Sequence, residues 1–538
     1  MLERILVSNA QLALALLGTA LLLWGTWLAR RGCGEVARVL RDRALAALGV
    51  LGLLAFANFG RLNQGGFVHY WDTYHYFIGA KYFPELGYER LYECTAIADA
   101  QAGLGQEVQR RTMTDLHTNE QVPTLELLRH PERCTGHFSA ARWASFKEDV
   151  AWFRDRMSPS SWLRSQRDHG YNATPVWNLV GHALADLAPA SDGSILALTL
   201  IDPVLILAAF ALLVRCFGWR VAAVAALMLG TYYPARFSWT GGAFLRYDWL
   251  FFAVAGLCAL RKERPFLAGI ALAYAALLRL FPAALLVGPA VVLIEQLWRT
   301  RRLPSLRSSA LRLSAGAALT VALALPPALA TTGDWGRGFF ENTLKHADTP
   351  LTNHMGLPTV LSYRPAATVS SLRQDLDDES VWPRFMEARR QALHPLRPIL
   401  LVAALLVLVL LWKAARQEPW RLAVLSSILI AVLLQLTCYY YVFLVAWATL
   451  IEGRRDPEAA SSDRPPALAT AHSFLVGAVL LGIGAASMLL LVLLHSHVST
   501  DVAYVAHSVV TLLGLGAVLV LEVRHGRREE SAARPPHT

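Results

Sequence analysis

Charged residues are scarce in this sequence. Lys, Arg, Asp and Glu make up 17% of its 538 residues, whereas hydrophobic residues make up 55% and the mean hydropathy is +0.38. A water-soluble domain of this length carries a larger charged share, so the composition excludes a soluble globular protein. We therefore expect a chain that crosses a membrane many times.

Familiar catalytic motifs and cysteine pairs are also missing. No P-loop, GxGxxG fingerprint, HExxH helix or GxSxG elbow occurs in a supporting context, which disfavours a soluble nucleotide-dependent site. None of the six cysteines forms a CxxC pair. Only Cys94 and Cys134 lie together in a predicted extramembrane loop, where an oxidising compartment would permit a disulfide closing about 40 residues.

Apolar runs recur along the whole chain. About 20 residues are needed to cross roughly 30 Å of hydrocarbon, and the runs predict an all-α, polytopic membrane protein of about 13 transmembrane helices. Several are short enough to be tilted, broken or re-entrant. The expected spans lie near residues 8–28, 44–60, 194–217, 219–235, 241–260, 265–281, 282–298, 309–331, 396–413, 420–437, 438–451, 471–494 and 502–522.

Lys and Arg residues mark one side of the predicted bundle. Basic turns follow every odd-numbered span, at residues 30–43, 215–220, 261–264, 299–312, 413–421, 454–464 and 524–528. Because such turns stay in the cytoplasm, the N-terminus is expected outside and the C-terminus inside. The net charge of +10 is then a topological signal and an attraction to membrane lipids, and we expect no nucleic-acid partner.

This reading divides the chain into five parts. They are an N-terminal two-helix segment (1–60), a large outer loop domain (61–193), a transmembrane core (194–331), a second outer loop (332–395) and a C-terminal bundle with a cytoplasmic tail (396–538). Function is expected in the two outer loops. Amphipathic helices of the outer face, such as 140–157, would either lie on the bilayer surface or pack within the loop domain.

Titratable and aromatic side chains are concentrated in segment 67–83, directly after the second span. Asp72 lies between His69 and His75, where a general base or a ligand would sit. At three-residue spacing the histidines would share a helical face with Asp72. They could donate hydrogen bonds or ligate a divalent metal, although the spacing matches no standard metal motif. Two further side chains, Tyr76 and Lys81, would line the same groove or belong to an interfacial aromatic belt.

Buried charges mark the interior of the bundle. Arg279 lies in an apolar run near its outer end, which is costly unless an anion or a cavity receives the side chain or it reaches the headgroups. Arg246 and Asp248 would form an internal ion pair or line a cavity. Asp202, within another apolar segment, would face the same interior.

The second outer loop carries a third polar cluster, at residues 341–356. Lys345, His346, Asn353 and His354 are concentrated where a loop could cover a bound substrate, although a solvated loop would also be polar. Arg364 follows shortly after and could contact a phosphate.

These features together resemble the GT-C superfamily of membrane glycosyltransferases, which use polyprenyl-phosphate-linked sugars. The shared features are an Asp in the first outer loop shortly after a span, an amphipathic loop domain and many following spans. The run 265–289, with Arg279 before Phe281-Pro282, looks like the short helix-break-helix segment of the glycosyltransferase family 87 mannosyltransferases. The chain departs from that family in its extra N-terminal span and its long first loop.

The resemblance implies a bacterial inner-membrane enzyme that transfers a sugar, with inversion, from a polyprenyl-phosphate donor to an envelope glycan or glycolipid on the periplasmic side. Asp72 would be the general base, and no cofactor would be required because arginine can stabilise the phosphate leaving group. The donor phosphate would contact Arg279, Lys345, His346 and Arg364. Substrate binding would fall to His69, His75, Tyr76, Lys81, Arg246, Asp248, Asn353 and His354.

Two other functions fit the same features. A transporter or flippase for a lipid-linked glycan would also need charges inside the membrane and usually has paired broken helices in both halves. One broken pair is predicted at 265–298 and a second at 420–451, but the halves share no matching sequence. An O-antigen ligase or polymerase would place its essential residues in a late loop, whereas the strongest cluster here comes early.

Overall fold

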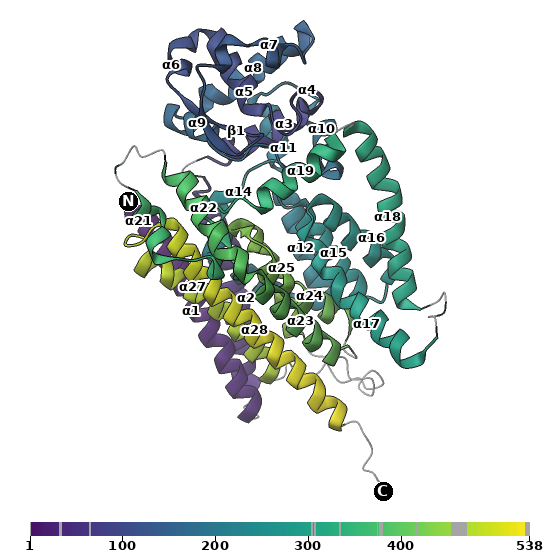
Figure 1. Cartoon of the computed structure of the whole chain (residues 1–538). Helices are drawn as coiled ribbons and strands as arrows, with labels where there is room; N and C mark the ends of the chain where they lie inside the picture. The colour runs from purple at the N-terminus through teal and green to yellow at the C-terminus, as the bar shows by residue number, and fades with distance from the viewer. Residues whose placement is uncertain are drawn as a thin grey trace.

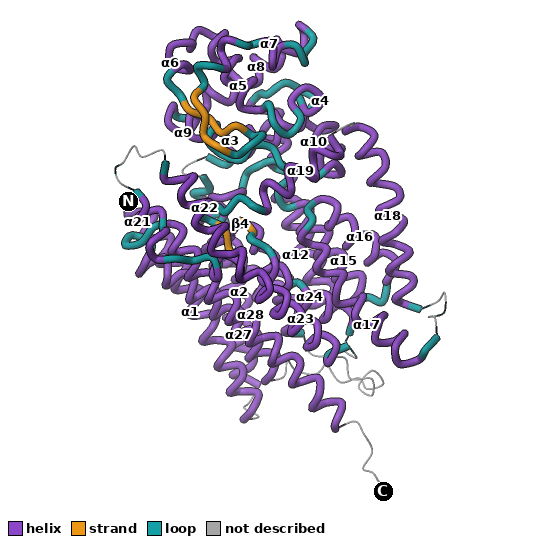
Figure 2. The backbone as a smooth tube through the Cα atoms, viewed as in Figure 1, coloured by secondary structure: helices purple, strands orange, loops and turns teal. Residues whose placement is uncertain are grey.

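The regular structure of the protein is almost entirely helical, which confirms the all-α class (Figure 2). The structure is a computed structural model, and it describes residues 2–31, 35–63, 66–302, 305, 308–332, 335–373, 375, 380–415, 418–452 and 471–532. The basic turn expected at 454–464 lies outside these residues. Two small two-stranded sheets accompany the helices within the described part.

Seven helical stretches in the described part are long and apolar enough to cross a membrane, so the chain is a multi-pass membrane protein. These stretches are Ile5–Arg31, Asp192–Phe217, Phe281–Thr300, Ser309–Thr332, Val381–Lys413, Ala471–Leu494 and Thr500–Gly526. Other expected spans form shorter helices, among them α13 (Trp219–Thr231), α15 (Asp248–Arg261), α16 (Pro265–Leu278) and α24 (Pro419–Ser426). Length and hydropathy therefore account for about half of the 13 expected crossings.

Helix α2 (Glu35–Phe56) contacts α13 almost backbone to backbone. A Cβ added at Gly230 would lie 2.0 Å from the Gly52 carbonyl oxygen, and one at Gly49 would lie 2.7 Å from the Ala223 Cβ. Small residues permit such close approach where van der Waals packing, rather than the hydrophobic effect, holds helices together in a bilayer. This contact anchors the N-terminal segment to the transmembrane core.

A compact outer domain lies at one end of the bundle (Figure 1). It contains α3 (Tyr70–Lys81), α5 (Leu91–Asp99), α8 (Ala140–Arg156) and α10 (Pro175–Ala185), with a hairpin of β1 (Thr112–Asp115) and β2 (Glu120–Pro123). In Figure 1, α1 (Leu2–Arg31) begins at the end of the bundle that carries this domain, and α28 (Thr500–Ala532) ends away from it.

The aromatic face of α8 is buried inside the outer domain. Phe146 and Phe153 are fully buried, Trp143 nearly so, and the Phe153 ring lies 5.8 Å from the Phe77 ring of α3. Of the two interpretations of segment 140–157, packing within the domain is therefore correct and a position on the bilayer surface is wrong.

The helical conformation is interrupted between α16 and α17 (Ala284–Thr300), beginning at Arg279. Pro282 has no N–H to donate to the Leu278 carbonyl, so the helix cannot continue, and Arg279 is extended with φ −147° and ψ 134°. The Arg279 guanidinium donates to the freed Leu278 carbonyl oxygen at 3.0 Å, and the Thr174 hydroxyl donates to the neighbouring Leu277 carbonyl oxygen at 2.6 Å. The helix break predicted in segment 265–298 is thus present, and it holds Arg279 against the outer domain.

A second break follows α25 (Ile428–Leu433). Strand β4 (Leu436–Thr437) pairs antiparallel with β3 (His354–Met355) of the second outer loop, and a 3₁₀ segment, Cys438–Phe443, continues into the bundle. This pairing attaches the second outer loop to the membrane bundle.

Candidate active site

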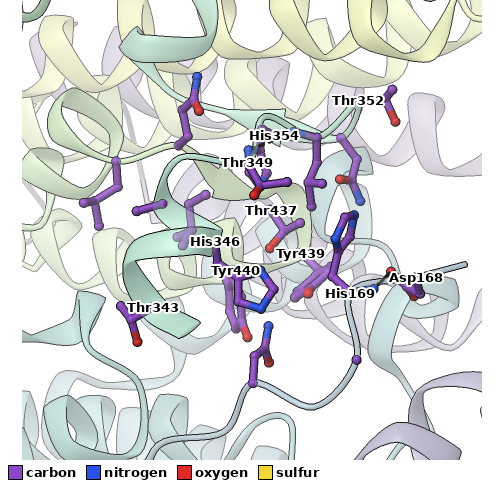
Figure 3. A pocket seen from close by; sticks show the side chains of 18 of the residues that line it. Asp168, His169, Thr343, His346, Thr349, Thr352, His354, Thr437, Tyr439 and Tyr440 are labelled. Carbon is purple, nitrogen blue, oxygen red and sulfur yellow. Dashed lines mark hydrogen bonds between the residues drawn. The ribbon is translucent and has the colours of Figure 1, made fainter. Parts of the chain in front are cut away.

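A cavity of 1470 Å³ lies where the outer domain meets the membrane bundle. Its walls come from α3, the 164–174 loop, α19 (Trp335–Ala347), the second outer loop and both helix breaks. Figure 3 shows part of its wall. Nine residues that the sequence suggested line it: His69, Asp72, His75, Tyr76, Arg246, Arg279, His346, Asn353 and His354.

Asp72 forms an ion pair in the cavity wall. It occupies the first turn of α3, and its Oδ2 lies 3.1 Å from Arg246 Nε, whose side chain is 2% exposed. The expected partner of Arg246, Asp248, is elsewhere: it is buried, lies outside the cavity lining and accepts the Trp249 amide at 2.8 Å. Arg246 thus orients the candidate base.

The loop that carries Arg246 is held by Asp202. The buried Asp202 carboxylate, near the start of α12 (Ile201–Phe217), accepts the backbone N–H groups of Arg246 at 2.7 Å and Tyr247 at 3.1 Å. Trp177 adds a third tie, donating its indole N–H to the Leu245 carbonyl at 3.0 Å. Asp202 therefore faces the interior as expected but acts as a positioning residue behind the cavity.

Arg279 presents unsatisfied donors to the cavity. Its side chain is buried, and Nε and Nη2 have no hydrogen-bond partner among the described residues. No carboxylate of the described chain forms an ion pair with it. Its guanidinium carbon lies 5.5 Å from the Tyr76 ring, and that of Arg246 lies 4.1 Å from the same ring. Buried guanidinium donors without an acceptor are costly, so this site favours an anionic ligand.

His69 and His75 use their ring nitrogens to hold α3. His69 caps the helix by accepting the Asp72 amide at Nδ1, and its Nε2 lies 3.2 Å from the Ser238 carbonyl. His75 bonds to the Trp71 carbonyl and to the Tyr92 hydroxyl, both at 2.7 Å. Among the described residues, no group of three His, Cys, Asp or Glu side chains is arranged to hold a metal ion.

Three further candidates lie outside the cavity lining. Lys81 forms a buried ion pair with Asp149 at 2.8 Å inside the outer domain. Lys345 donates to the Leu116 carbonyl and so joins α19 to that domain. Arg364 is exposed and donates to backbone carbonyls of its own turn. Positive charge alone did not distinguish these structural cations from Arg279.

A histidine group on the outer side of the cavity includes one residue that the sequence analysis did not single out, His169. Its ring lies 6.1 Å from that of His346 and 5.8 Å from that of Trp382 on α22 (Val381–Leu393). Burial lowers the pKa of His354 to about 3, that of His346 well below its usual value and that of His169 below its usual value. The three imidazoles are therefore neutral at pH 7. In the sequence, the Asp-His-Gly triplet at 168–170 is the feature that could have indicated His169 as a candidate site residue.

One wall of the cavity is apolar and opens at the helix breaks. Leu280, Leu401, Leu433 and Leu434 line it, and their side chains remain 52%, 63%, 38% and 39% exposed. These residues come from the breaks themselves and from α23 (Arg397–Lys413), an apolar helix. The cavity therefore has an exposed apolar rim in addition to its titratable side chains.

Cys94 and Cys134 are joined by a disulfide bridge, with their Cα atoms 5.4 Å apart. The bridge connects α5 to α7 (Glu132–Thr135) and encloses the β1–β2 hairpin. It belongs to the framework of the outer domain.

No protein-family model, no curated protein and no solved structure matches this chain. The class it defines is a multi-pass helical membrane protein with a cavity, lined by apolar and titratable side chains, where an outer domain meets the bundle.

Proposed function

We propose that the protein is a glycosyltransferase of GT-C organisation that moves a sugar from a polyprenyl-phosphate donor to an envelope glycan or glycolipid. The single observation that carries this proposal is that one cavity is lined both by a carboxylate, Asp72, and by a buried guanidinium, Arg279, with unsatisfied donors. A base and an anion site within one cavity are what displacement of a phosphate leaving group needs.

The reaction is a single displacement at the anomeric carbon. An acceptor hydroxyl oxygen bonds to C1 of the donor sugar while the bond from C1 to the phosphate oxygen breaks, so the configuration inverts. Asp72 takes the hydroxyl proton, and Arg246 at 3.1 Å orients its carboxylate. The phosphate leaves with the electron pair, and Arg279 N–H groups stabilise its negative charge.

The leucine-lined opening supports a lipid-borne donor. A polyprenyl chain in the bilayer can pass between Leu280, Leu401 and Leu433, with its phosphate beside Arg279 at the first helix break. In this proposal the outer domain and the N-terminus are periplasmic, the C-terminus is cytoplasmic, and the short broken helices complete about 13 crossings of a bacterial inner membrane.

The proposal is tested with the full chain in nanodiscs, radiolabelled polyprenyl-phosphate sugars and a membrane extract as acceptor. Wild type should transfer label from one donor, Asp72→Asn should lose transfer, and Asp155→Asn should retain it because Asp155 is exposed outside the cavity. If no donor gives transfer, or if Asp72→Asn transfers at the wild-type rate, the proposed activity or base is wrong. Movement of labelled donor across the bilayer without transfer would instead support a flippase.

A further inference from the structure

Hydrogen bonds connect the histidine group to α3, the helix that carries the candidate base. Trp71, the neighbour of Asp72 in α3, donates its indole N–H to Asp168 Oδ2 at 2.7 Å, and the other Asp168 oxygen accepts the His169 amide. These bonds tie the loop that carries His169 to the first turn of α3, and His169 and Asp72 line the same cavity. Both Asp168 oxygens are occupied in this way.

Two of the three imidazoles, those of His346 and His354, have a hydrogen-bond partner at Nδ1. His346 Nδ1 lies 3.5 Å from the Asn119 amide nitrogen, and His354 Nδ1 accepts the Leu351 amide at 3.2 Å. A neutral ring that accepts at Nδ1 carries its proton on Nε2, which leaves an Nε2–H donor on each. His169 Nδ1 is buried and has no hydrogen-bond partner among the described residues.

An aromatic surface and further polar side chains complete this part of the cavity. Trp382 is half-buried, lines the cavity and stacks on Phe385 with ring centroids 5.8 Å apart. Hydroxyl and amide side chains share the same wall, as Figure 3 shows in part: Asn342, Thr343, Thr349, Thr352, Asn353 and Thr437. Neutral donors and acceptors beside an indole suit a ring with hydroxyl groups at its edge and C–H groups on its face.

We propose that His169, His346 and His354, with Trp382, form the acceptor subsite and that it takes a neutral, hydroxyl-rich saccharide. This inference rests on the proposed function, which it deepens by naming the acceptor class. The leucine opening and Arg279 occupy the membrane side of the cavity, whereas these four residues come from the outer domain and the second outer loop. Donor and acceptor thus enter from different sides and meet at Asp72.

Neutral imidazoles and an indole give no electrostatic preference for a charged ligand, and burial opposes one. Burial lowers the pKa of His346 well below its usual value, with His169 and Lys345 adding to the effect. A phosphorylated or acidic sugar would have to lose its hydration here without gaining a cationic partner from the group.

The test measures saccharide binding without any donor. Saturation-transfer NMR is recorded on the full chain in nanodiscs with the methyl glycosides of mannose, glucose and galactose, and with glucuronic acid and glucose 6-phosphate. At least one neutral glycoside should bind. His346→Gln and Trp382→Ala should each weaken that binding about fivefold or more, and Trp382→Phe should restore part of it. His130→Gln, an exposed histidine of the same domain, should leave it unchanged.

Three results would overturn the subsite: no binding of any neutral glycoside, tighter binding of the charged probes, or binding that the cavity variants leave unaltered. Failure of the transferase itself is distinguishable. If neutral glycosides bind through these residues and no donor is ever transferred, the subsite stands and the transferase proposal falls. If sugar transfer proceeds and His346→Gln leaves the KM for the acceptor unchanged, the transferase proposal is supported and the acceptor subsite is contradicted.

Discussion

Arg246 Nε lies 3.1 Å from Asp72 Oδ2, although the two residues are far apart in the sequence. The pair joins α3 of that domain to a loop of the membrane bundle. The guanidinium carbon of Arg246 also lies 4.1 Å from the centre of the Tyr76 ring. The candidate base is therefore oriented from the membrane side, while the helix that carries it belongs to the outer domain.

Replacing Asp72 by Asn should lower kcat of sugar transfer about 10³-fold, because the amide cannot accept the hydroxyl proton. Arg246→Gln should lower kcat less, since the base remains but is no longer oriented. The double variant should be no worse than Asp72→Asn alone, because both changes act on one unit. Steady-state rates in nanodiscs check this, and additive losses would show that Arg246 acts separately.

Replacing Arg279 by Gln should lower kcat/KM for the lipid donor about 100-fold, because charged donors to the phosphate are lost. Arg279→Lys should recover part of the loss, since it keeps the charge but not the paired donors. The acceptor KM should stay near its wild-type value. Arg364→Gln is the matched control, since Arg364 is exposed and outside the cavity lining, and an equal loss there would contradict the assignment.

Replacing Asp202 by Ala should destabilise the protein by about 1–3 kcal/mol, because two buried backbone N–H groups lose their acceptor. It should also lower kcat, since the loop that holds Arg246 is released. Thermal unfolding and transfer rates measured together separate the two effects. Asp192→Ala removes an exposed carboxylate from the same end of the bundle and should change neither greatly.

Removing the disulfide with Cys94→Ala and Cys134→Ala should lower stability by roughly 4 kcal/mol, because the bridge closes a loop of 40 residues. Dithiothreitol should lower the apparent Tm of wild type and leave that of the double variant unchanged. Equal sensitivity of both proteins to the reductant would show that the bridge is not formed.

Acidification should destabilise the outer side of the cavity. Burial lowers the pKa of His354 to about 3 and that of His169 and His346 below their usual value, while the unfolded chain binds these protons near pH 6.5. Unfolding therefore takes up protons below pH 6.5. As the pH is lowered below that value, the free energy of unfolding decreases by up to about 1.4 kcal/mol per pH unit for each histidine. Asp168 and Lys345 face the group, and Asp168 partly offsets the effect on His169.

The apparent Tm, measured between pH 7.5 and pH 5, should therefore decrease as the pH falls. His354→Asn should flatten the curve, whereas His117→Asn should not, since His117 is exposed on the outer domain. A Tm that does not depend on pH in this range would contradict the neutral state of the three histidines.

Local chemistry made several features predictable. Segment 67–83 combined a carboxylate with two histidines, and the structure places all three in the cavity lining. Pro282 indicated a helix break, because a residue without an N–H cannot continue a helix, and that break positions Arg279. The β1–β2 hairpin was not anticipated, since its two four-residue strands lie within a domain that otherwise reads as helical.

The sequence by itself determined the membrane class, the helix breaks and the types of side chain available, because hydropathy and backbone chemistry act over a few neighbouring residues. Only the tertiary structure decided which of those side chains meet. Arg246 pairs with Asp72 rather than with Asp248. Lys81 and Lys345 form contacts that hold the outer domain together or attach it to α19. The rings of His169 and His346 lie 6.1 Å apart. Burial and ion pairing depend on residues distant in sequence, so the sequence does not show whether a charged side chain is paired, as Lys81 is, or buried with unsatisfied donors, as Arg279 is.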